Sequence, residues 1–279
     1  MIIPGFIIAA LWGAIGSFAL LIGGFFGYKF NISKKIIAIT AAFSSGMLIS
    51  AVCFELLFKS YSYGDIYSTS IGFAIGVILF TTMDAIVHKF SIEKSKNKEI
   101  LKEDFKNTRK TNKNDINNLN ILKHRYNQYF NKYQIKGLTT VFGATLDGIP
   151  ESIAIGLIYF IGGPISIVLL STIFVANLFE GASASLNMKL GGWKAKEIFK
   201  IWTLVILLTT TSAMLSYIIF SHTDKHLLSA VLAMAAGGFI AMIADTLLPE
   251  AYDEMQELTG LIMGIGFLIS FVLSHLTMY

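Results

Sequence analysis

Leu138-Thr-Thr-Val-Phe-Gly-Ala-Thr-Leu-Asp-Gly-Ile-Pro-Glu-Ser-Ile-Ala-Ile-Gly-Leu-Ile-Tyr-Phe-Ile161 is the stretch that decides the fold of this chain. It is long enough to cross the hydrocarbon core of a bilayer as a helix, which takes roughly 20 mostly apolar residues. Yet it places Asp147 and Glu151 near its middle. An ionised carboxylate at that depth costs at least about 2.5–3.5 kcal/mol, so a chain that keeps two of them there has a use for them.

The rest of the chain repeats this apolar pattern. Of its 279 residues, 54% are hydrophobic and 14% are charged, whereas a soluble domain is nearer about 25% charged. The runs lack the alternation of β-barrel strands, and helices satisfy their own backbone in lipid. We therefore predict an all-α polytopic membrane protein with eight transmembrane helices, grouped three, two and three, at about 4–27, 36–58, 68–89, 138–161, 164–188, 198–221, 227–249 and 258–278.

The basic residues predict the orientation. Three connections on one side of the bilayer hold 20 of the 22 Lys and Arg residues. By the positive-inside rule that side is cytoplasmic, which leaves both termini outside the cytoplasm of a multi-pass plasma-membrane protein. Because orientation accounts for the net charge of +4, we expect the lipid bilayer as a partner and no nucleic acid.

The same pattern divides the chain into three parts. Residues 1–90 hold the first three spans and residues 137–279 hold the last five. Between them, residues 91–136 form a basic, Asn-rich cytoplasmic linker. Its composition is typical of a solvated, partly disordered loop.

A weak internal repeat relates the second span to the seventh. When Gly46 is aligned with Gly237, the Leu-Leu pairs also match, and Glu55 falls one place from Asp245. The two spans cross the bilayer in opposite directions. The expected arrangement is therefore an inverted repeat, which in transporters places the binding site at the midplane between the halves.

The fourth span carries the first part of a candidate site. Asp147 and Glu151 are four residues apart, so they project from one face of a helix. Pro150 has no N–H and frees the carbonyl of Leu146 beside them. These groups form an oxygen-rich notch about halfway across the bilayer.

The fifth span supplies Asn177 and Glu180, again on one helical face. The connection near Gly162 to Pro164 is short, so the fourth and fifth spans are antiparallel neighbours. Three carboxylates, an amide and a freed carbonyl suit a divalent cation. The alternative is a proton-sharing, hydrogen-bonded cluster that only holds the two helices together.

Further acids extend from this site towards both sides of the bilayer. Glu55 is expected near the outer end of its span, and Asp84, Asp245 and Glu250 near the inner end of theirs, as a candidate path for the cation. Each also fits an interfacial residue that reaches for water. Met47 is a candidate soft ligand, and packing in the core is the alternative for it.

Four segments resemble the ZIP (Zrt/Irt-like) family of divalent metal transporters, together with the eight spans and the long loop after the third. They are Pro150-Glu151, Glu180-Gly181, Gly46-Met47-Leu48 and Asp245-Thr-Leu-Leu-Pro-Glu250. The resemblance covers nearly the whole chain except the linker. It implies zinc as the transported substrate and a rocking or elevator-like motion of the spans.

The chain departs from the family pattern at the site itself. Asp147 replaces the histidine of the fourth span, Gly148 the next asparagine and Phe179 the proline of the fifth span. Comparison with bacterial members implies one site around Asp147, Glu151 and Glu180 in place of two. Without imidazole, Mn²⁺, Fe²⁺ and Cd²⁺ stay open beside Zn²⁺.

We therefore predict a divalent-metal transporter, not an enzyme, that moves cations into the cytoplasm by alternating access. Asp147, Glu151 and Glu180 are the predicted ligands, with Asn177 and Met47 as auxiliaries. A proton-coupled carrier of another solute and a metal-binding relative without transport are the alternatives. An aspartyl intramembrane protease would need a second aspartate in the cluster. The sequence leaves a homodimer open.

Overall fold

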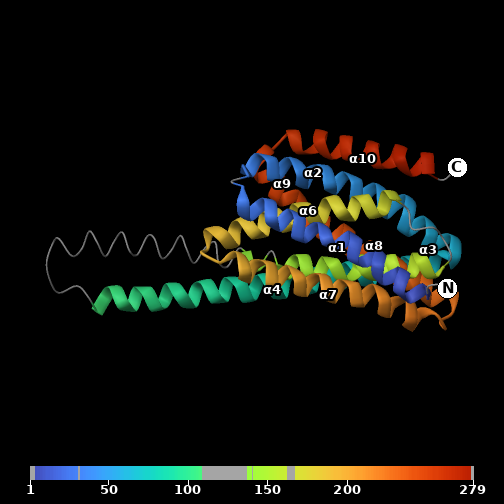
Figure 1. Ribbon diagram of the computed structural model, residues 1–279, viewed down its shortest axis with the longest axis horizontal. Coiled ribbons are helices and arrows are strands. Elements are labelled where there is room, and N and C mark those ends of the chain that lie inside the picture. The colour runs from blue at the N-terminus through green and yellow to red at the C-terminus, as the bar shows by residue number, and fades with distance from the viewer. Residues whose placement is uncertain (1–3, 31, 109–136, 140, 162–166, 278–279) are drawn as a thin grey trace.

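The computed structural model describes residues 4–30, 32–108, 137–139, 141–161 and 167–277, which are helical almost throughout (Figure 1). No strand occurs in these ranges, as the prediction of an all-α fold requires. The elements are α1 (Gly5–Lys29), α2 (Lys34–Ala51), η1 (Val52–Leu57), α3 (Phe58–Tyr63), α4 (Ile66–Thr108), the fourth span (Gly137–Phe160), α6 (Ile167–Leu190), α7 (Ala195–Phe220), α8 (Lys225–Met242), η2 (Ile243–Leu247), α9 (Leu248–Met255) and α10 (Leu258–Thr277).

Within the described ranges, eight helices are long and apolar enough to cross a membrane, which confirms the predicted number. Two of these spans are composite. The second span joins α2, η1 and α3 into one run, Lys34–Tyr63, and the seventh joins α8, η2 and α9 into Lys225–Met255. The η elements are π-helical turns, which widen the helix and are frequent at functional sites.

The helices cross the bundle in alternating directions, so both ends of the chain lie at one end of the molecule (Figure 1). The connections that carry the basic residues lie at the opposite end, which we call the inner end because the positive-inside rule predicts that it is cytoplasmic. There the Lys34 Nζ lies 3.6 Å from the Glu254 Oε1, which joins the start of α2 to α9. The acidic connection before the last span thus lies beside basic residues.

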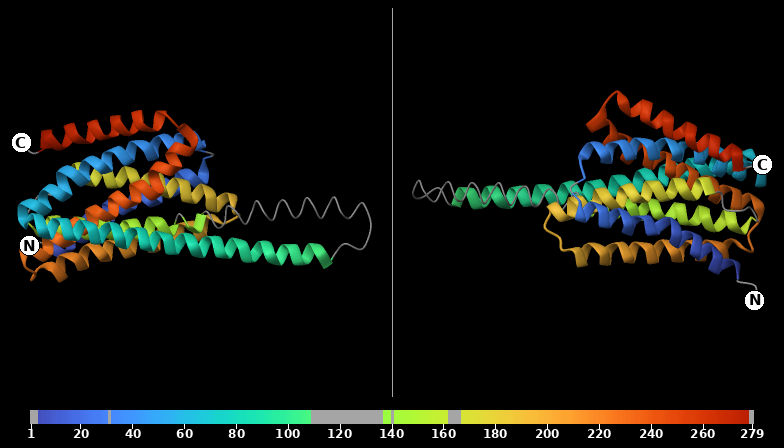
Figure 2. Two further views of the ribbon diagram at one scale, coloured as in Figure 1. Left: turned by 180° about the vertical axis from the view of Figure 1, so that it is seen from behind. Right: turned by 45° about the horizontal axis from the view of Figure 1, so that its top comes forward.

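The predicted linker is helical over its first part. Residues 91–108, which composition assigned to a solvated loop, continue α4 to Thr108 beyond the other helices (Figure 2). The apolar span itself ends near Val87, and polar residues with good helix propensity then extend the same helix into water. The remainder of the linker, and the short connection at 162–166, lie outside the described residues.

Close backbone contacts support the inverted repeat. The second span packs on the eighth, where a Cβ at Gly46 would collide with the carbonyl oxygen of Met263. The seventh span packs on the third, where a Cβ at Gly237 would collide with the carbonyl of Phe73. The two glycines aligned in the sequence therefore make equivalent contacts, each with the outer helix of the opposite half.

The reciprocal contacts repeat as well. Gly266 on α10 lies against the carbonyl of Phe43, and Gly76 on α4 lies against the carbonyl of Met234. Phe43 and Met234 are 191 residues apart, as Gly46 and Gly237 are, and Gly76 and Gly266 are 190 residues apart. The π-helical turns also follow these contacts at corresponding places, η1 in the second span and η2 in the seventh.

Burial separates a central group of spans from a lipid-facing group. The second, fourth, fifth and seventh spans are mostly buried, whereas α4, α7 and α10 expose long rows of Leu, Ile and Phe. Exposed apolar side chains on a spanning helix contact acyl chains. The polar groups of the fourth and fifth spans therefore lie inside the bundle, away from lipid.

Candidate metal site

The fourth span holds its two acids in the interior. The side chains of Asp147 and Glu151 are 4% and 2% exposed, and they lie one turn apart on one face, as their spacing predicted. The Ser152 hydroxyl donates to the carbonyl of Gly148 at 2.6 Å. This bond satisfies the serine within its own helix and leaves it no proton for the acids.

On α6, Asn177 bridges the acids to the first span. Its Nδ2 donates to the Glu151 Oε2 at 3.2 Å and to the backbone carbonyl of Gly16 on α1 at 3.3 Å. Both amide protons are therefore used, and the amide oxygen is left to accept. Glu180 lies one turn further along α6 and is 4% exposed. We call Asp147, Glu151, Asn177 and Glu180 the central cluster.

The central cluster is short of hydrogen-bond donors. Among the described residues, five of its buried oxygens have no hydrogen-bond partner: Asp147 Oδ1, Glu151 Oε1, Asn177 Oδ1, Glu180 Oε1 and Glu180 Oε2. Buried polar atoms are almost always paired, and an unpaired one costs about 1–3 kcal/mol. Five unpaired oxygens on neighbouring side chains are acceptors that a bound cation or added protons would satisfy.

Electrostatic contact joins the three carboxylates into one group. Glu180 interacts with both Asp147 and Glu151 across the interface of the two helices. In the described part of the chain, however, no three His, Cys, Asp or Glu side chains are arranged to hold a single metal ion. The central cluster is thus a set of neighbouring acids, and an ion bound there would have to draw them together.

Two of the predicted path residues lie next to the central cluster. Asp84 of α4 interacts electrostatically with Asp147, and Glu250 of α9 does so with Glu180. The Glu250 Oε1 also accepts a hydrogen bond from the Ser183 hydroxyl at 3.2 Å. Acidic groups therefore continue from the central cluster along α4 and α9.

Sequence reasoning missed two residues on this inward side, Ser183 and Asn187. Both are buried, and the Asn187 Nδ2 donates to the carbonyl of Ser183 at 2.9 Å. They follow Glu180 at intervals of three and four residues, so α6 presents one polar stripe from mid-membrane to its inner end. That spacing is visible in the sequence and is the signal that could have found them.

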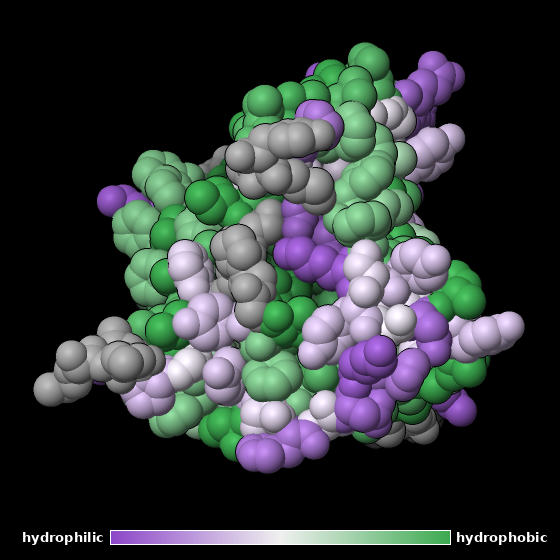
Figure 3. All heavy atoms as spheres, turned by 90° about the vertical axis from the view of Figure 1, so that its right-hand side faces the viewer, coloured by the Kyte–Doolittle hydropathy of each residue, from purple (hydrophilic) through white to green (hydrophobic). Residues whose placement is uncertain are grey.

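The other predicted residues have different surroundings. Glu55 is buried and paired with Lys59, and Asp245 is exposed on η2. Met47 is buried in α2, and its backbone carbonyl accepts a hydrogen bond from Ser270 on α10. At the outer end of the molecule, hydrophilic side chains gather beside a hollow near the middle of the bundle (Figure 3).

Comparison with known families agrees with this geometry. The family model described as ZIP Zinc transporter matches residues 2–274, nearly the whole chain. The chain belongs to the ZIP zinc transporter family. A search of curated proteins gave no match.

Membership makes this ZIP protein a multi-pass membrane protein from a family of divalent metal transporters. The family resemblance rested on Pro150-Glu151 of the fourth span and Glu180-Gly181 of the fifth. These two segments carry three of the unpartnered oxygens inside the bundle. The motif and the unsatisfied acceptors therefore coincide.

Proposed function

We propose that this ZIP protein carries a divalent cation through the central cluster and into the cytoplasm by alternating access. The observation that supports this most directly is the group of five buried, unpartnered oxygens. A bound cation would satisfy several of them at once and offset the repulsion between like charges. A structural, proton-sharing cluster would instead be expected to show hydrogen bonds between its carboxyl groups, whereas the hydrogen bond described within this cluster runs from the amide of Asn177 to Glu151.

The ligands in this proposal are Asp147, Glu151 and Glu180, with the Asn177 oxygen as a fourth and Met47 as an auxiliary. Oxygen donors alone suit hard and borderline divalent ions. Zinc is proposed from the family, and Mn²⁺, Fe²⁺ and Cd²⁺ share the same ligand preference closely enough to compete. The metal is the transported substrate and has no catalytic task.

The inward path in this proposal runs along the polar stripe of α6. From Glu180 the ion would pass Ser183 and its partner Glu250 towards Asn187, with Asp84 close to Asp147 of the central cluster. The Asn177 bridge to Gly16 ties the ligands of α6 to α1. These helices would then move together, in a plasma-membrane protein whose termini lie outside the cytoplasm.

The test is metal uptake into proteoliposomes. Glu151→Ala and Glu180→Ala should each abolish uptake, because each removes a ligand whose oxygen has no other partner. The matched control is Glu254→Ala, which removes an exposed acid paired with Lys34 at the inner end. Melting temperature in detergent, measured for each variant, separates loss of transport from loss of fold.

Three outcomes would contradict the proposal. Unchanged uptake in both variants would show that the central cluster is structural. Metal binding without flux in the unmodified protein would show a binding relative that does not transport. Uptake of an organic solute driven by a proton gradient, insensitive to metals, would favour the proton-coupled carrier.

A further inference from the structure

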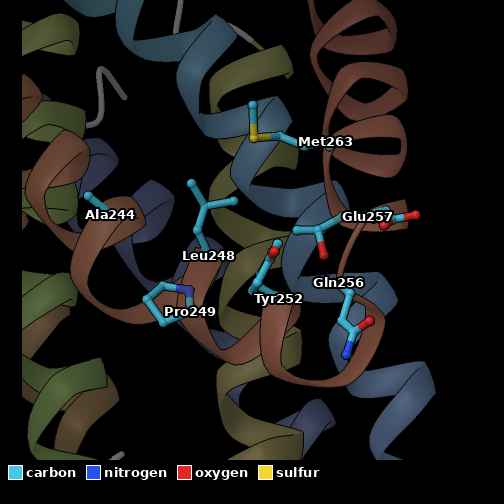
Figure 4. A pocket seen from close by; sticks show the side chains of 9 residues that line it. Ala244, Leu248, Pro249, Tyr252, Gln256, Glu257 and Met263 are labelled. Carbon is cyan, nitrogen blue, oxygen red and sulfur yellow. The ribbon is translucent and has the colours of Figure 1, made fainter.

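A groove opens between α9 and α10, apart from the central cluster (Figure 4). Its volume is about 580 Å³, within the range of roughly 300–1,000 Å³ typical of small-molecule sites. The lining residues come from the end of the seventh span, the turn after it and the start of the eighth. They are Ala244, Leu248, Pro249, Tyr252, Gln256, Glu257, Thr259, Gly260 and Met263.

The lining is graded from apolar to polar. Ala244, Leu248 and Met263 line the part that lies deeper in the bilayer, whereas Gln256 and Glu257 lie at the turn, at the inner end (Figure 4). An apolar groove on a membrane surface must be filled, and an occupant with an apolar tail and a polar head matches this gradient. A phospholipid of the inner leaflet has that form.

The polar end of the groove holds an unsatisfied hydroxyl. Thr259 lines the groove, is 4% exposed, and its Oγ1 has no hydrogen-bond partner among the described residues. It lies in the first turn of α10, a helix of 20 residues. The N–H of Thr259 donates to the carbonyl of Gln256 at 3.1 Å, whereas the dipole of a helix N-terminus favours an anionic group such as phosphate. The hydroxyl and the helix terminus thus form one candidate phosphate site.

The charge of the lining residues restricts which lipid headgroup the groove can bind. Glu257 is acidic, and no basic residue lines the groove, although the inner end of this protein is otherwise rich in lysine. The carboxylate repels an anionic headgroup and attracts an ammonium group beyond the phosphate. We infer that the groove binds a zwitterionic aminophospholipid, with its phosphate at Thr259 and the start of α10 and its ammonium at Glu257.

A second copy of this chain is the competing occupant. Gly260 and Gly264 are four residues apart on α10, and a Cβ at either would meet open space. Such a pair allows close packing of two membrane helices. The apolar-to-polar gradient and the unpaired hydroxyl favour the lipid, since a partner helix would offer no headgroup at the turn.

The test uses the full-length protein, delipidated in detergent and examined by native mass spectrometry. Phosphatidylethanolamine, phosphatidylcholine and phosphatidylglycerol are added in turn. We expect one phosphatidylethanolamine to be retained roughly two- to fivefold better than phosphatidylglycerol, the effect of a partly exposed ion pair. Equal retention of the two lipids, or better retention of phosphatidylglycerol, would overturn the inference.

Three variants assign the effect to the groove. Glu257→Gln should remove the preference for phosphatidylethanolamine, and Thr259→Val should weaken retention of all three lipids. Gly260→Leu should fill the groove and remove the bound lipid. Glu254→Gln, an exposed acid outside the groove, is the matched control and should change nothing. A Glu257→Gln protein with its preference intact would contradict the proposed ammonium contact.

The same mass spectra also show whether a second copy of this chain, the competing occupant, is bound. A dimer that Gly260→Leu dissociates, with no selective lipid, would assign the groove to a second copy and overturn the lipid site. None of these measurements involves metal, so the lipid site can fail while the transport proposal stands, and the reverse.

Discussion

Two buried acidic sites in this protein differ in how their carboxylate oxygens are paired. Glu55 is 3% exposed, and both of its oxygens are engaged. Its Oε2 lies 3.2 Å from the Lys59 Nζ, and its Oε1 accepts a hydrogen bond from Ser274 on α10 at 2.8 Å. The carboxylates of the central cluster are equally buried, yet most of their oxygens lack a partner.

The difference shows what each site is for. A carboxylate paired with a cation on its own span, as Glu55 is with Lys59, needs no external counterion. It can serve a structural contact, here the hydrogen bond from Ser274 that joins the eighth span to the second. A carboxylate without such a cation must take its counterion from outside. Burial therefore does not distinguish a structural acid from a functional one inside a membrane, and the partners of each oxygen do.

The sharpest way to break this comparison is to neutralise one acid from each site. Metal at about 100 times its dissociation constant should stabilise the unmodified protein by about 2.7 kcal/mol. Glu180→Gln should lose this stabilisation, because it removes a ligand charge, and Glu55→Gln should keep it. Thermal unfolding in detergent, with and without Mn²⁺ or Zn²⁺, measures both. If Glu55→Gln also loses the effect, the two sites do not differ in this way.

Asn177 provides the next largest effect. Asn177→Ala should weaken metal binding at least about 10-fold, because loss of an outer-shell partner alone costs roughly 10–100-fold and this variant also removes the proposed ligand oxygen. Asn177→Asp keeps an oxygen but removes the donor to Glu151 and Gly16. Titration of the thermal shift with metal compares the two variants. Binding retained in Asn177→Asp alone identifies the oxygen as the group that matters, whereas equal losses identify the amide bridge.

Removal of Lys59, the basic partner of Glu55, tests the structural site in a second way. Breaking a fully buried pair costs about 3–5 kcal/mol, and Lys59 is 27% exposed, so Lys59→Met should cost about 1–2 kcal/mol. The double variant Glu55→Gln/Lys59→Met should recover most of this, since no unpaired charge remains. Chemical unfolding of the three proteins gives the values. A double variant no more stable than Lys59→Met would show that the unpaired charge of Glu55 is not the cause of the loss.

The smallest effect concerns Asp65, a partly exposed acid at the outer turn before α4. The backbone N–H and hydroxyl of Ser68 donate to it and, with the nearby His226, hold its pKa below the usual value. A lowered pKa adds stability above the unfolded pKa of about 3.9, and this is lost as pH falls through the folded pKa. Asp65→Asn should therefore melt slightly lower than wild type at pH 6, with the gap closing below pH about 4. A gap independent of pH would exclude the ionic contribution.

Much of the fold follows from the order of residues along the chain. Eight apolar runs of membrane length can only be satisfied as helices in lipid, and the number of spans places both termini on one side. The match of Gly46 to Gly237 could also be found in the sequence, because two helices whose backbones touch require glycine at the point of contact. The helical extension to Thr108 was not, since charged, good helix formers resemble a disordered linker in composition.

The candidate site was predictable in part. The spacing of Asp147 and Glu151, and of Asn177 and Glu180, determined which faces of two helices carry polar groups. The sequence could not tell Glu55 from these acids, because all four are acids within apolar runs. Lys59 lies one helical turn beyond Glu55, a spacing that allows the pair but does not require it.

By itself, the sequence determined that this protein spans the membrane eight times as helices and carries acids at mid-membrane, because hydropathy and helical periodicity are local properties. Only the tertiary structure decided which acids are paired and which are left with free oxygens. It also decided which polar residues line one inward stripe and where α9 and α10 part to form a groove. Those are properties of contacts between segments far apart in the chain, and local physics does not encode them.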